Sequence, residues 1–333
     1  MSIKIAINGF GRIGRLVFRR IKELEETELE VVAVNDLADN KDLAYSLKYD
    51  TAHGIFPYEV EAKEDSILVD GEEIKAFEEK DASKLPWSDL DIDIVLECTG
   101  LYTTKEKAQA HLEAGAKKVI ISAPAKDKDT KIVVYGVNEE TLNMSDKIIS
   151  AASCTTNGLA LMTKVLVDEF GIQRGLMTGS RAYTATQNLQ DAPGGRKNRA
   201  GAQNVIPVTT GAANALGKVI PEVKGIITGT TTRVPVITAG FVELFSVLDK
   251  AVTIEQINEA MKAAANDSYG YTEDEIVSSD VVGDTHGSVF DATLTEVLDA
   301  NGGQLVKTVA WYDNEYGFVS NMIRLVEYFA QLV

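Results

Sequence analysis

The sequence predicts an α/β domain on a doubly wound, mostly parallel sheet, followed by an α+β domain with a mainly antiparallel sheet. Its length of 333 residues is enough for two domains. Short apolar strands alternate with helical stretches over roughly the first 150 residues, which is typical of a parallel sheet. Beyond Phe170 the strand-like stretches are longer and are joined by hairpin signals, as in antiparallel sheets.

The composition is ordinary for a globular protein, with an acidic balance. Acidic residues number 50 against 33 basic ones, giving a formal net charge of -17, so we expect no general nucleic-acid surface. No apolar run is long enough to span a membrane, and the chain enters a strand pattern at once, which leaves no room for a signal peptide. Two cysteines and three scattered histidines predict neither a disulfide framework nor a metal site. A reducing, cytoplasmic setting fits best.

The first element is a strand over 3–7 that ends in a glycine-rich turn. Residues 8–14 read Asn-Gly-Phe-Gly-Arg-Ile-Gly, a G-x-G-x-x-G pattern, and a helix follows. A second strand over 30–34 leads to Asp36, about 20 residues past the last glycine, where an acid can bind ribose hydroxyls. A tight turn without a ligand would explain the glycines alone, but the whole context favours a Rossmann dinucleotide site. The Asp36 charge would repel a ribose phosphate, which predicts NAD over NADP.

The same alternation of strands and helices continues to about residue 150. The predicted elements are a helix over 42–49, hairpin strands over 59–76, a strand over 93–97, a helix over 104–114, and strands over 119–121 and 132–135. Strand ends at Asp36, Thr99 and Ser122 are predicted to line the crevice where such sheets bind ligands.

Cys154 stands where a buried strand over 148–152 gives way to a helix. Ser153, Thr155 and Thr156 are residue types that begin helices. The unpaired amides and the dipole of a helix start favour a thiolate, and they can also receive the oxyanion formed when it attacks a carbonyl. Two interpretations are open, namely a nucleophile and a buried structural cysteine.

The second half changes pattern after this helix. The predicted elements are a Thr- and Tyr-rich stretch over 176–187, a polar loop to about 204, a helix over 210–219, strands over 226–236 and 241–248, a helix over 254–265, strands over 289–297 and 305–311 around a hairpin, and an amphipathic helix over 319–332. The densest basic patch of this half lies within the polar loop, over 194–199, and is a candidate anion site.

At this point the chain resembles the phosphorylating glyceraldehyde-3-phosphate dehydrogenases over essentially its whole length. The most specific stretches are Ser-Cys-Thr-Thr-Asn over 153–157 and Trp-Tyr-Asp-Asn-Glu over 311–315. The other matching stretches are 7–14, 35–37, 47–54, 97–100, 182–187, 210–213 and 233–235.

The resemblance implies a fold, a reaction and partners. It implies a Rossmann NAD-binding domain over 1–152 and 316–333 around a catalytic domain over 153–315, usually in a homotetramer. The implied reaction is glycolytic: the cysteine attacks glyceraldehyde 3-phosphate, a hydride passes to NAD, and inorganic phosphate cleaves the thioester to give 1,3-bisphosphoglycerate. No metal, nucleic acid or membrane is implied as a partner.

The resemblance also implies roles for particular residues. The catalytic positions are Cys154 and Arg181. The cofactor positions are Asn8, Gly9, Gly11, Arg12, Ile13, Gly14, Asp36, Thr99, Gly100 and Ser122, with Asn314 on the nicotinamide amide. The positions that bind the substrate phosphate or the attacking phosphate are Ser153, Thr155, Thr184, Arg199, Thr210, Gly211 and Arg233. Arginine forks and hydroxyls are groups that suit a phosphate.

The sequence departs from the family at the catalytic base. The family has a histidine two residues before the Tyr-Thr pair, and here that position is Arg181. A guanidinium can stabilise a thiolate or an oxyanion, but it cannot accept the proton released on oxidation. A positioned base is worth about 10²–10⁴ in rate, so slow turnover is expected. Two alternatives are a catalytically weak NAD-binding paralogue with an interaction or regulatory role, and a dehydrogenase of another phosphorylated aldehyde such as erythrose 4-phosphate.

The polar loop departs as well. The stretch 191–199 is about three residues shorter than the usual one. Arg199 is therefore a less secure match for the phosphate ligand, and Arg196 competes with it.

Overall fold

The computed structural model describes residues 2–332, which divide into two compact units. The first contains the chain up to Val133, Glu139–Ala152 and the chain from Met322 onward, and the second contains Val134–Asn138 and Ser153–Asn321. One division point falls inside the last helix, α7 (Tyr316–Ala330). No helix within residues 2–332 is long and apolar enough to cross a membrane.

The first unit is built on a nine-stranded sheet in the order β10-β11-β9-β8-β1-β2-β7-β6-β5. Its strands are β1 (Ile3–Asn8), β2 (Leu29–Asn35), β5 (Val60–Ala62), β6 (Ser66–Val69), β7 (Glu72–Phe77), β8 (Ile94–Glu97), β9 (Lys118–Ile121), β10 (Lys131–Ile132) and β11 (Ile148–Ser150). All neighbours from β10 to β7 pair in parallel, and only β7–β6 and β6–β5 are antiparallel. The predicted parallel sheet is confirmed.

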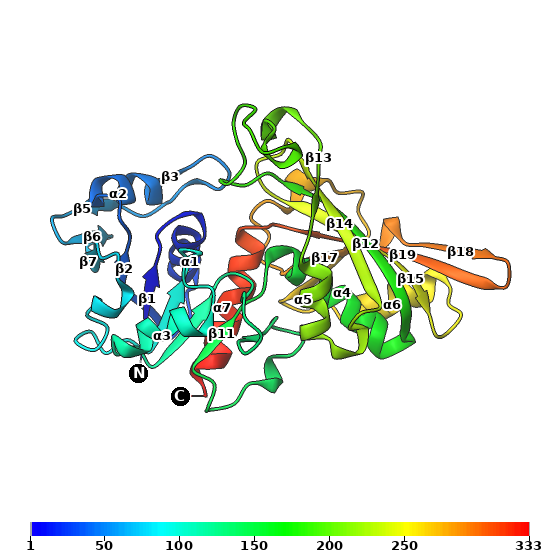
Figure 1. Ribbon diagram of the computed structural model, residues 1–333, viewed down its shortest axis with the longest axis horizontal. Coiled ribbons are helices and arrows are strands. Elements are labelled where there is room, and N and C mark those ends of the chain that lie inside the picture. Colours follow the sequence, from blue (N-terminus) through cyan, green and yellow to red (C-terminus); the bar gives the residue numbers. More distant parts are fainter. Residues whose placement is uncertain (1, 333) are drawn as a thin grey trace. The chain divides into compact units, whose positions relative to one another are not determined.

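Helices connect the parallel strands of this unit. They are α1 (Arg12–Glu23), α2 (Asn40–Lys48) and α3 (Lys105–Glu113), and a small ladder joins β3 (Tyr49–Asp50) to β4 (Gly54–Ile55). The part of this unit from β1 to α3 is drawn in blue to cyan in Figure 1. The units β1–α1–β2 and β8–α3–β9 place the carboxyl ends of four adjacent strands at one edge of the sheet, where dinucleotide sites form.

The second unit is built on an eight-stranded sheet in the order β13-β14-β12-β15-β19-β17-β16, with β18 paired to β19. Its strands are β12 (Ile172–Ala182), β13 (Ile206–Thr209), β14 (Ile227–Val234), β15 (Gly240–Leu248), β16 (Tyr269–Thr272), β17 (Ser288–Asp291), β18 (Glu296–Ala300) and β19 (Gly303–Tyr312). Only β12–β14 and β16–β17 are parallel. The predicted mainly antiparallel sheet is therefore confirmed, and the long strands run side by side in Figure 1.

Three helices complete the second unit: α4 (Cys154–Phe170), α5 (Ala212–Val219) and α6 (Ile254–Ala263). Helix α4 packs on β15, β17 and β19 and contacts both other helices. Gly158 allows this close approach, because a Cβ there would lie 2.7 Å from the ring of Tyr312. The sheet therefore fixes the position of the helix that begins at Cys154.

Two predicted strands are wrong in extent. The strand predicted over 132–135 is only Lys131–Ile132, and a turn that contains Gly136, at a positive φ of 83°, follows over 135–137. The strand predicted over 289–297 is two strands, β17 and β18. Asp291 separates them, because its side chain accepts a hydrogen bond from the Thr293 amide at 3.0 Å and starts a short helical turn.

Candidate active site

The cofactor turn follows β1. Gly9 has a φ of 91°, and a Cβ there would lie 2.6 Å from the Thr99 amide nitrogen. A Cβ at Gly14 would lie 2.2 Å from the Gly9 carbonyl oxygen, so helix α1 packs directly on the turn. Gly11, by contrast, faces open space at the amino end of α1. Two glycines are thus needed for close packing, while the third leaves room for a pyrophosphate at a helix start.

Asp36 follows β2 and closes this turn. Its carboxylate accepts hydrogen bonds from the amides of Phe10 at 2.7 Å and Ala38 at 3.1 Å. These two bonds fix the carboxylate, which can accept further bonds from ribose hydroxyls. The residues present therefore fit a dinucleotide with an unphosphorylated ribose.

Arg12 is the first residue of α1 and pairs with Asp50. Burial alone would raise the pKa of Asp50, but hydrogen bonds from Arg12 and from the amides of His53 and Ala52 outweigh it and hold that pKa below its usual value. The ion pair keeps the Arg12 side chain at the same helix start as Gly11 and next to Ile13.

Thr99 and Ser122 follow β8 and β9. The Thr99 hydroxyl donates to Glu97 and accepts from the Leu101 amide at 3.0 Å. The Ser122 hydroxyl donates to the Glu97 carbonyl at 2.9 Å. Both hydroxyl protons are therefore engaged within the unit, so these residues shape the turn around Gly100 more than they offer donors to a ligand.

Cys154 is the first residue of α4, and Ser153 is its N-cap, accepting from the Thr156 amide at 3.1 Å. Burial raises the pKa of the Cys154 thiol, while the charge of Arg181 and hydrogen bonds from Thr155 and the backbone lower it. The predicted thiolate-favouring groups are all present, but burial outweighs them. Arg181 supplies the largest of the opposing effects.

Arg181 and Arg233 lie side by side near the ends of the parallel strands β12 and β14, where they are register partners. On the other side of β12, Gly240 is opposite Arg181, and a Cβ there would lie 2.4 Å from the Ser180 carbonyl oxygen. Burial, and then the Arg181 charge, lower the pKa of Arg233. The Nε atoms of both arginines are buried and hydrogen-bond to none of residues 2–332. An anion bound here would accept hydrogen bonds from the unused donors and would offset the repulsion between the two adjacent cations.

An open hollow of about 720 Å³ lies against these arginines. It is lined by Arg181, Thr186, Gly194, Arg196, Lys197, Asn198, Pro207, Val208, Thr209 and Arg233. Four cationic side chains in this hollow make it a candidate anion site within an acidic chain.

The polar loop brings Arg196 to this hollow, whereas Arg199 forms an exposed ion pair with Asp191, 2.7 Å from Nε to Oδ2. Gln187 anchors the loop: its amide nitrogen donates to the carbonyl of Arg199 at 2.6 Å, and its oxygen accepts from Arg233 at 2.6 Å. The sequence left Arg196 and Arg199 as competitors, and the geometry favours Arg196. Lys197 belongs to the basic patch predicted over 194–199, whereas the sequence gives no signal for Thr186 and Thr209, because only the fold brings their segments to the hollow.

The remaining predicted positions lie at helix starts or near the hollow. Thr184 is hydrogen-bonded to Thr186, 3.1 Å between their hydroxyl oxygens. The Thr210 hydroxyl accepts from the Ala212 amide at 3.1 Å, and Gly211 is the N-cap of α5. Their role toward phosphate stays a prediction.

Asn314 is buried in the second unit, and its carboxamide oxygen accepts from the Ala239 amide at 2.8 Å and the Thr238 hydroxyl at 3.2 Å. A backbone amide can only donate, so this contact fixes which end of the carboxamide is the oxygen. Only the Asn314 amide nitrogen is left for a cofactor.

Each of the three histidines is hydrogen-bonded to an acidic residue. His286 contacts Asp284, 2.8 Å from Nδ1 to Oδ1, His111 contacts Glu97, and the amide of His53 bonds to Asp50. Burial, Arg181, Thr155 and the backbone are the main causes that shift the pKa of Cys154, and no histidine is among them. No group of three or more metal-binding side chains occurs in residues 2–332.

Comparison with known proteins decides the family. Residues 3–105 match the family model for the glyceraldehyde 3-phosphate dehydrogenase NAD binding domain, and residues 153–314 match that for the C-terminal domain. The chain belongs to the glyceraldehyde-3-phosphate dehydrogenase family. The glyceraldehyde-3-phosphate dehydrogenases of Clostridium pasteurianum and Clostridium acetobutylicum are 58% and 57% identical to it, each over 333 residues and 99% of both chains. That of Lactobacillus delbrueckii subsp. bulgaricus is 54% identical over the whole of both chains. The predicted family and the NAD cofactor are confirmed.

Substituting Arg181 with glutamine is expected to raise the pKa of Cys154 further, because the substitution removes the cation that opposes burial. The thiolate fraction at pH 8 then falls, and alkylation by iodoacetamide slows. The measurement is the alkylation rate of Cys154 against pH, read by peptide mass. Arg199→Gln is the matched control: it removes the same charge from an exposed ion pair and leaves the profile in place. An unshifted midpoint in Arg181→Gln contradicts the assignment.

Proposed function

We propose that the chain converts glyceraldehyde 3-phosphate to 1,3-bisphosphoglycerate, a glycolytic step, with NAD and inorganic phosphate and through a thioester on Cys154. The observation that carries the proposal is the position of Cys154 at the start of α4, within the electrostatic reach of Arg181. In this proposal residues 1–152 and 316–333 bind NAD, and residues 153–315 carry the chemistry.

The chain's own groups have separate tasks in this reaction. Cys154 attacks the aldehyde carbon, and the developing oxyanion is stabilised by the amides at the start of α4 and by the charge of Arg181. NAD, when bound, supplies the hydride acceptor. Phosphate then attacks the resulting thioester, which releases the acyl phosphate and returns Cys154 as a thiolate.

The anion hollow is proposed to bind the phosphates. Arg233 and Thr184 would bind the substrate phosphate, and Ser153, Thr155, Thr210 and Gly211 would face the attacking phosphate. For the cationic ligand from the polar loop we propose Arg196 in place of Arg199, since Arg196 lines the hollow. The unused Nε donors of Arg181 and Arg233 support an anion between them.

Proton removal is proposed to limit turnover. Arg181 cannot accept the proton of the hemithioacetal hydroxyl. The buried Tyr312 hydroxyl, 3.2 Å from that of Thr155, is not a substitute base, because burial, and then the charge of Cys154, raise its pKa well above the usual range. Water or bound phosphate must therefore take the proton, and the reaction is slow.

The arginine at position 181 also favours a second candidate function. A family member with an intact NAD site and no base at position 181 could act as a catalytically weak, NAD-binding protein with an interaction or regulatory role. Normal NAD binding with negligible turnover of both glyceraldehyde 3-phosphate and erythrose 4-phosphate would favour this candidate. Rapid turnover of erythrose 4-phosphate alone would assign the chain to that substrate.

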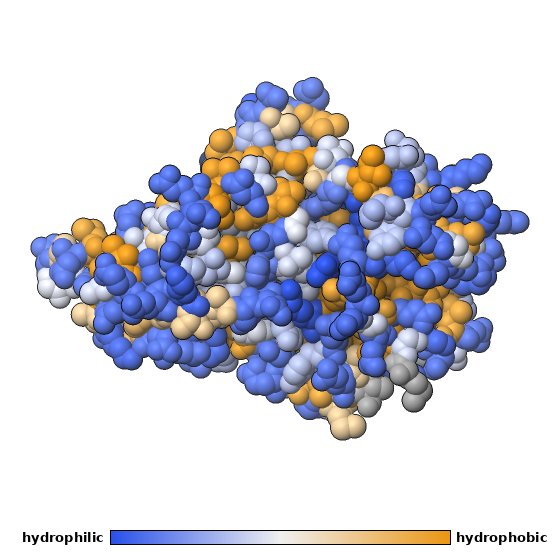
Figure 2. Space-filling view, turned by 180° about the vertical axis from the view of Figure 1, so that it is seen from behind, coloured by the Kyte–Doolittle hydropathy of each residue, from blue (hydrophilic) through white to orange (hydrophobic). Residues whose placement is uncertain are grey.

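A homotetramer in the cytoplasm is also part of the proposal and follows from the family. Polar side chains cover much of the face in Figure 2, with apolar patches between them. Large apolar side chains remain exposed in the described chain, among them Leu189 at 85% and Val205 at 66%. Such side chains are what contacts between copies would cover.

The proposal predicts that NADH formation from glyceraldehyde 3-phosphate requires inorganic phosphate for continued turnover. Without phosphate, NADH should stop at one equivalent per site, because the thioester is not cleaved. The measurement is absorbance of NADH over time, with and without phosphate, for this aldehyde and for erythrose 4-phosphate. Sustained NADH formation without phosphate would contradict the phosphorylating reaction.

A further inference from the structure

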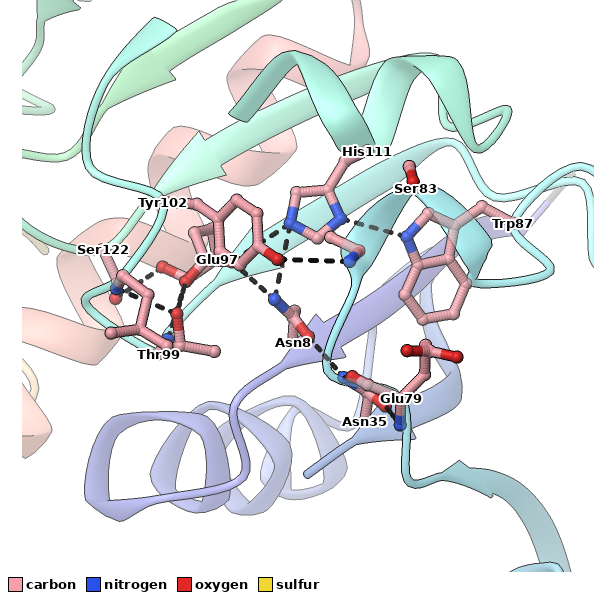
Figure 3. A network of polar contacts seen from close by, with 12 residues as sticks. Asn8, Asn35, Glu79, Ser83, Trp87, Glu97, Thr99, Tyr102, His111 and Ser122 are labelled. Carbon is pink, nitrogen blue, oxygen red and sulfur yellow. Dashed lines mark hydrogen bonds and ion pairs between the residues drawn. The ribbon is translucent and has the colours of Figure 1, made fainter. Parts of the chain in front are cut away.

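A buried polar network lies beneath the cofactor edge of the first unit (Figure 3). Asn8, Asn35 and Glu97 are the last residues of β1, β2 and β8, and His111 projects from α3 toward them. Trp87 lies on the far side of His111. The exposed fraction of these five residues is between 0% and 4%. The network contacts the cofactor turns from inside the fold, and none of the reaction chemistry described above uses it.

The hydrogen bonds fix the proton of His111. The Trp87 indole nitrogen lies 3.1 Å from His111 Nδ1, and an indole N–H can only donate. His111 Nδ1 is therefore an acceptor, and the ring carries its proton on Nε2. Nε2 lies 3.0 Å from Glu97 Oε2 and donates to it. The ring of Tyr102 packs against His111, with 5.4 Å between the ring centroids.

The Glu97 carboxylate accepts four hydrogen bonds in this network. Its Oε2 accepts from His111 and, at 2.6 Å, from the Asn8 amide. Its Oε1 accepts from the Thr99 backbone amide at 2.8 Å and from the Thr99 hydroxyl. Four donors fill the acceptor sites of a carboxylate, so each bond depends on the others to keep a buried carboxylate satisfied.

The same carboxylate holds the turn that Gly9 packs against. Thr99 is bonded twice to Glu97, and its backbone nitrogen lies 2.6 Å from where a Cβ of Gly9 would be. The side-chain oxygen of Asn8 accepts a hydrogen bond from the side-chain nitrogen of Asn35 at 2.7 Å, and Asn35 directly precedes Asp36. The glycine turn, the Thr99 turn and the ribose-binding acid are therefore connected through one buried cluster.

We propose that the chain of contacts Trp87–His111–Glu97 is a positioning device for NAD. Trp87 fixes the proton of His111 on Nε2, His111 holds Glu97, and Glu97 holds the Thr99 turn in the shape that receives the cofactor. His111 acts through Glu97 and is a positioning residue. If its N–H is removed, a carboxylate oxygen loses a buried donor and the two bonds to Thr99 are no longer fixed.

The test is NAD affinity, measured by isothermal titration calorimetry on the full chain, so it does not depend on turnover. His111→Leu removes both hydrogen bonds and is expected to weaken NAD binding about tenfold or more. His111→Gln can donate to Glu97 and accept from Trp87, and it should restore affinity to within about threefold of the native chain. Leu112→Ala, one residue along α3 and packed against the apolar core, is the matched control and leaves affinity unchanged.

A spectroscopic measurement checks the mechanism separately. The chain has three histidines, so ¹⁵N-histidine labelling gives a simple spectrum. We expect one ring with a protonated Nε2 and an unprotonated Nδ1, a form that is lost in Trp87→Phe. Trp87→Phe should also weaken NAD binding, and it replaces His111→Leu if the latter does not fold. A folded His111→Leu or Trp87→Phe variant that binds NAD as tightly as the native chain overturns the proposal, and so does a protonated Nδ1.

Discussion

Substituting Arg181 with histidine is expected to raise kcat for glyceraldehyde 3-phosphate oxidation about 10²–10⁴-fold. The range is what a positioned general base contributes. An imidazole at the end of β12 replaces a cation that cannot take the proton with a group that can, and the rest of the site is retained. The measurement is steady-state NADH formation with saturating NAD and phosphate.

The pH profile and one control variant separate this cause from others. In Arg181→His, activity should rise with pH through a midpoint near the ordinary histidine value of about 6.5, since only the neutral ring accepts a proton. Arg181→Gln also removes the charge beside Arg233 but adds no base, so its kcat should not gain. A native chain that already turns over at hundreds per second, with no gain in Arg181→His, would contradict the account of Arg181.

Substituting Cys154 with serine is expected to lower NADH formation from the aldehyde at least about 10³-fold. A serine hydroxyl is a far weaker acid than a thiol, and Arg181 cannot remove its proton. The NAD dissociation constant should stay unchanged, because the predicted pyrophosphate and ribose contacts lie in the first unit. Residual activity close to that of the native chain would exclude Cys154 as the nucleophile.

The cofactor half could be predicted because its signals are local in sequence. Gly9, Gly11 and Gly14 occupy fixed offsets after a strand. Close packing against the backbone requires a glycine at positions 9 and 14, whereas Gly11 faces open space. Asp36 likewise follows its strand at the expected distance. Short-range spacing is therefore sufficient for this site.

The rest of the site depends on contacts between distant segments. Arg181 and Arg233 are adjacent only through the register of β12 and β14. Similarly, no spacing rule joins Trp87, His111 and Glu97 to Asn8, because these contacts are set by parallel strand order and helix packing. The sequence predicts Thr99 and Ser122 as cofactor residues, but it does not show that their hydroxyls are hydrogen-bonded to Glu97.

The proposal of a Cys154 thioester is tested most directly by the mass of the intact chain after incubation with NAD and glyceraldehyde 3-phosphate in the absence of phosphate. The account predicts one phosphoglyceroyl group per chain, located on the Cys154 peptide and absent from Cys154→Ser. Added phosphate should remove it and return the native mass. NADH formation without any adduct on Cys154, or an adduct that phosphate does not discharge, would contradict the account.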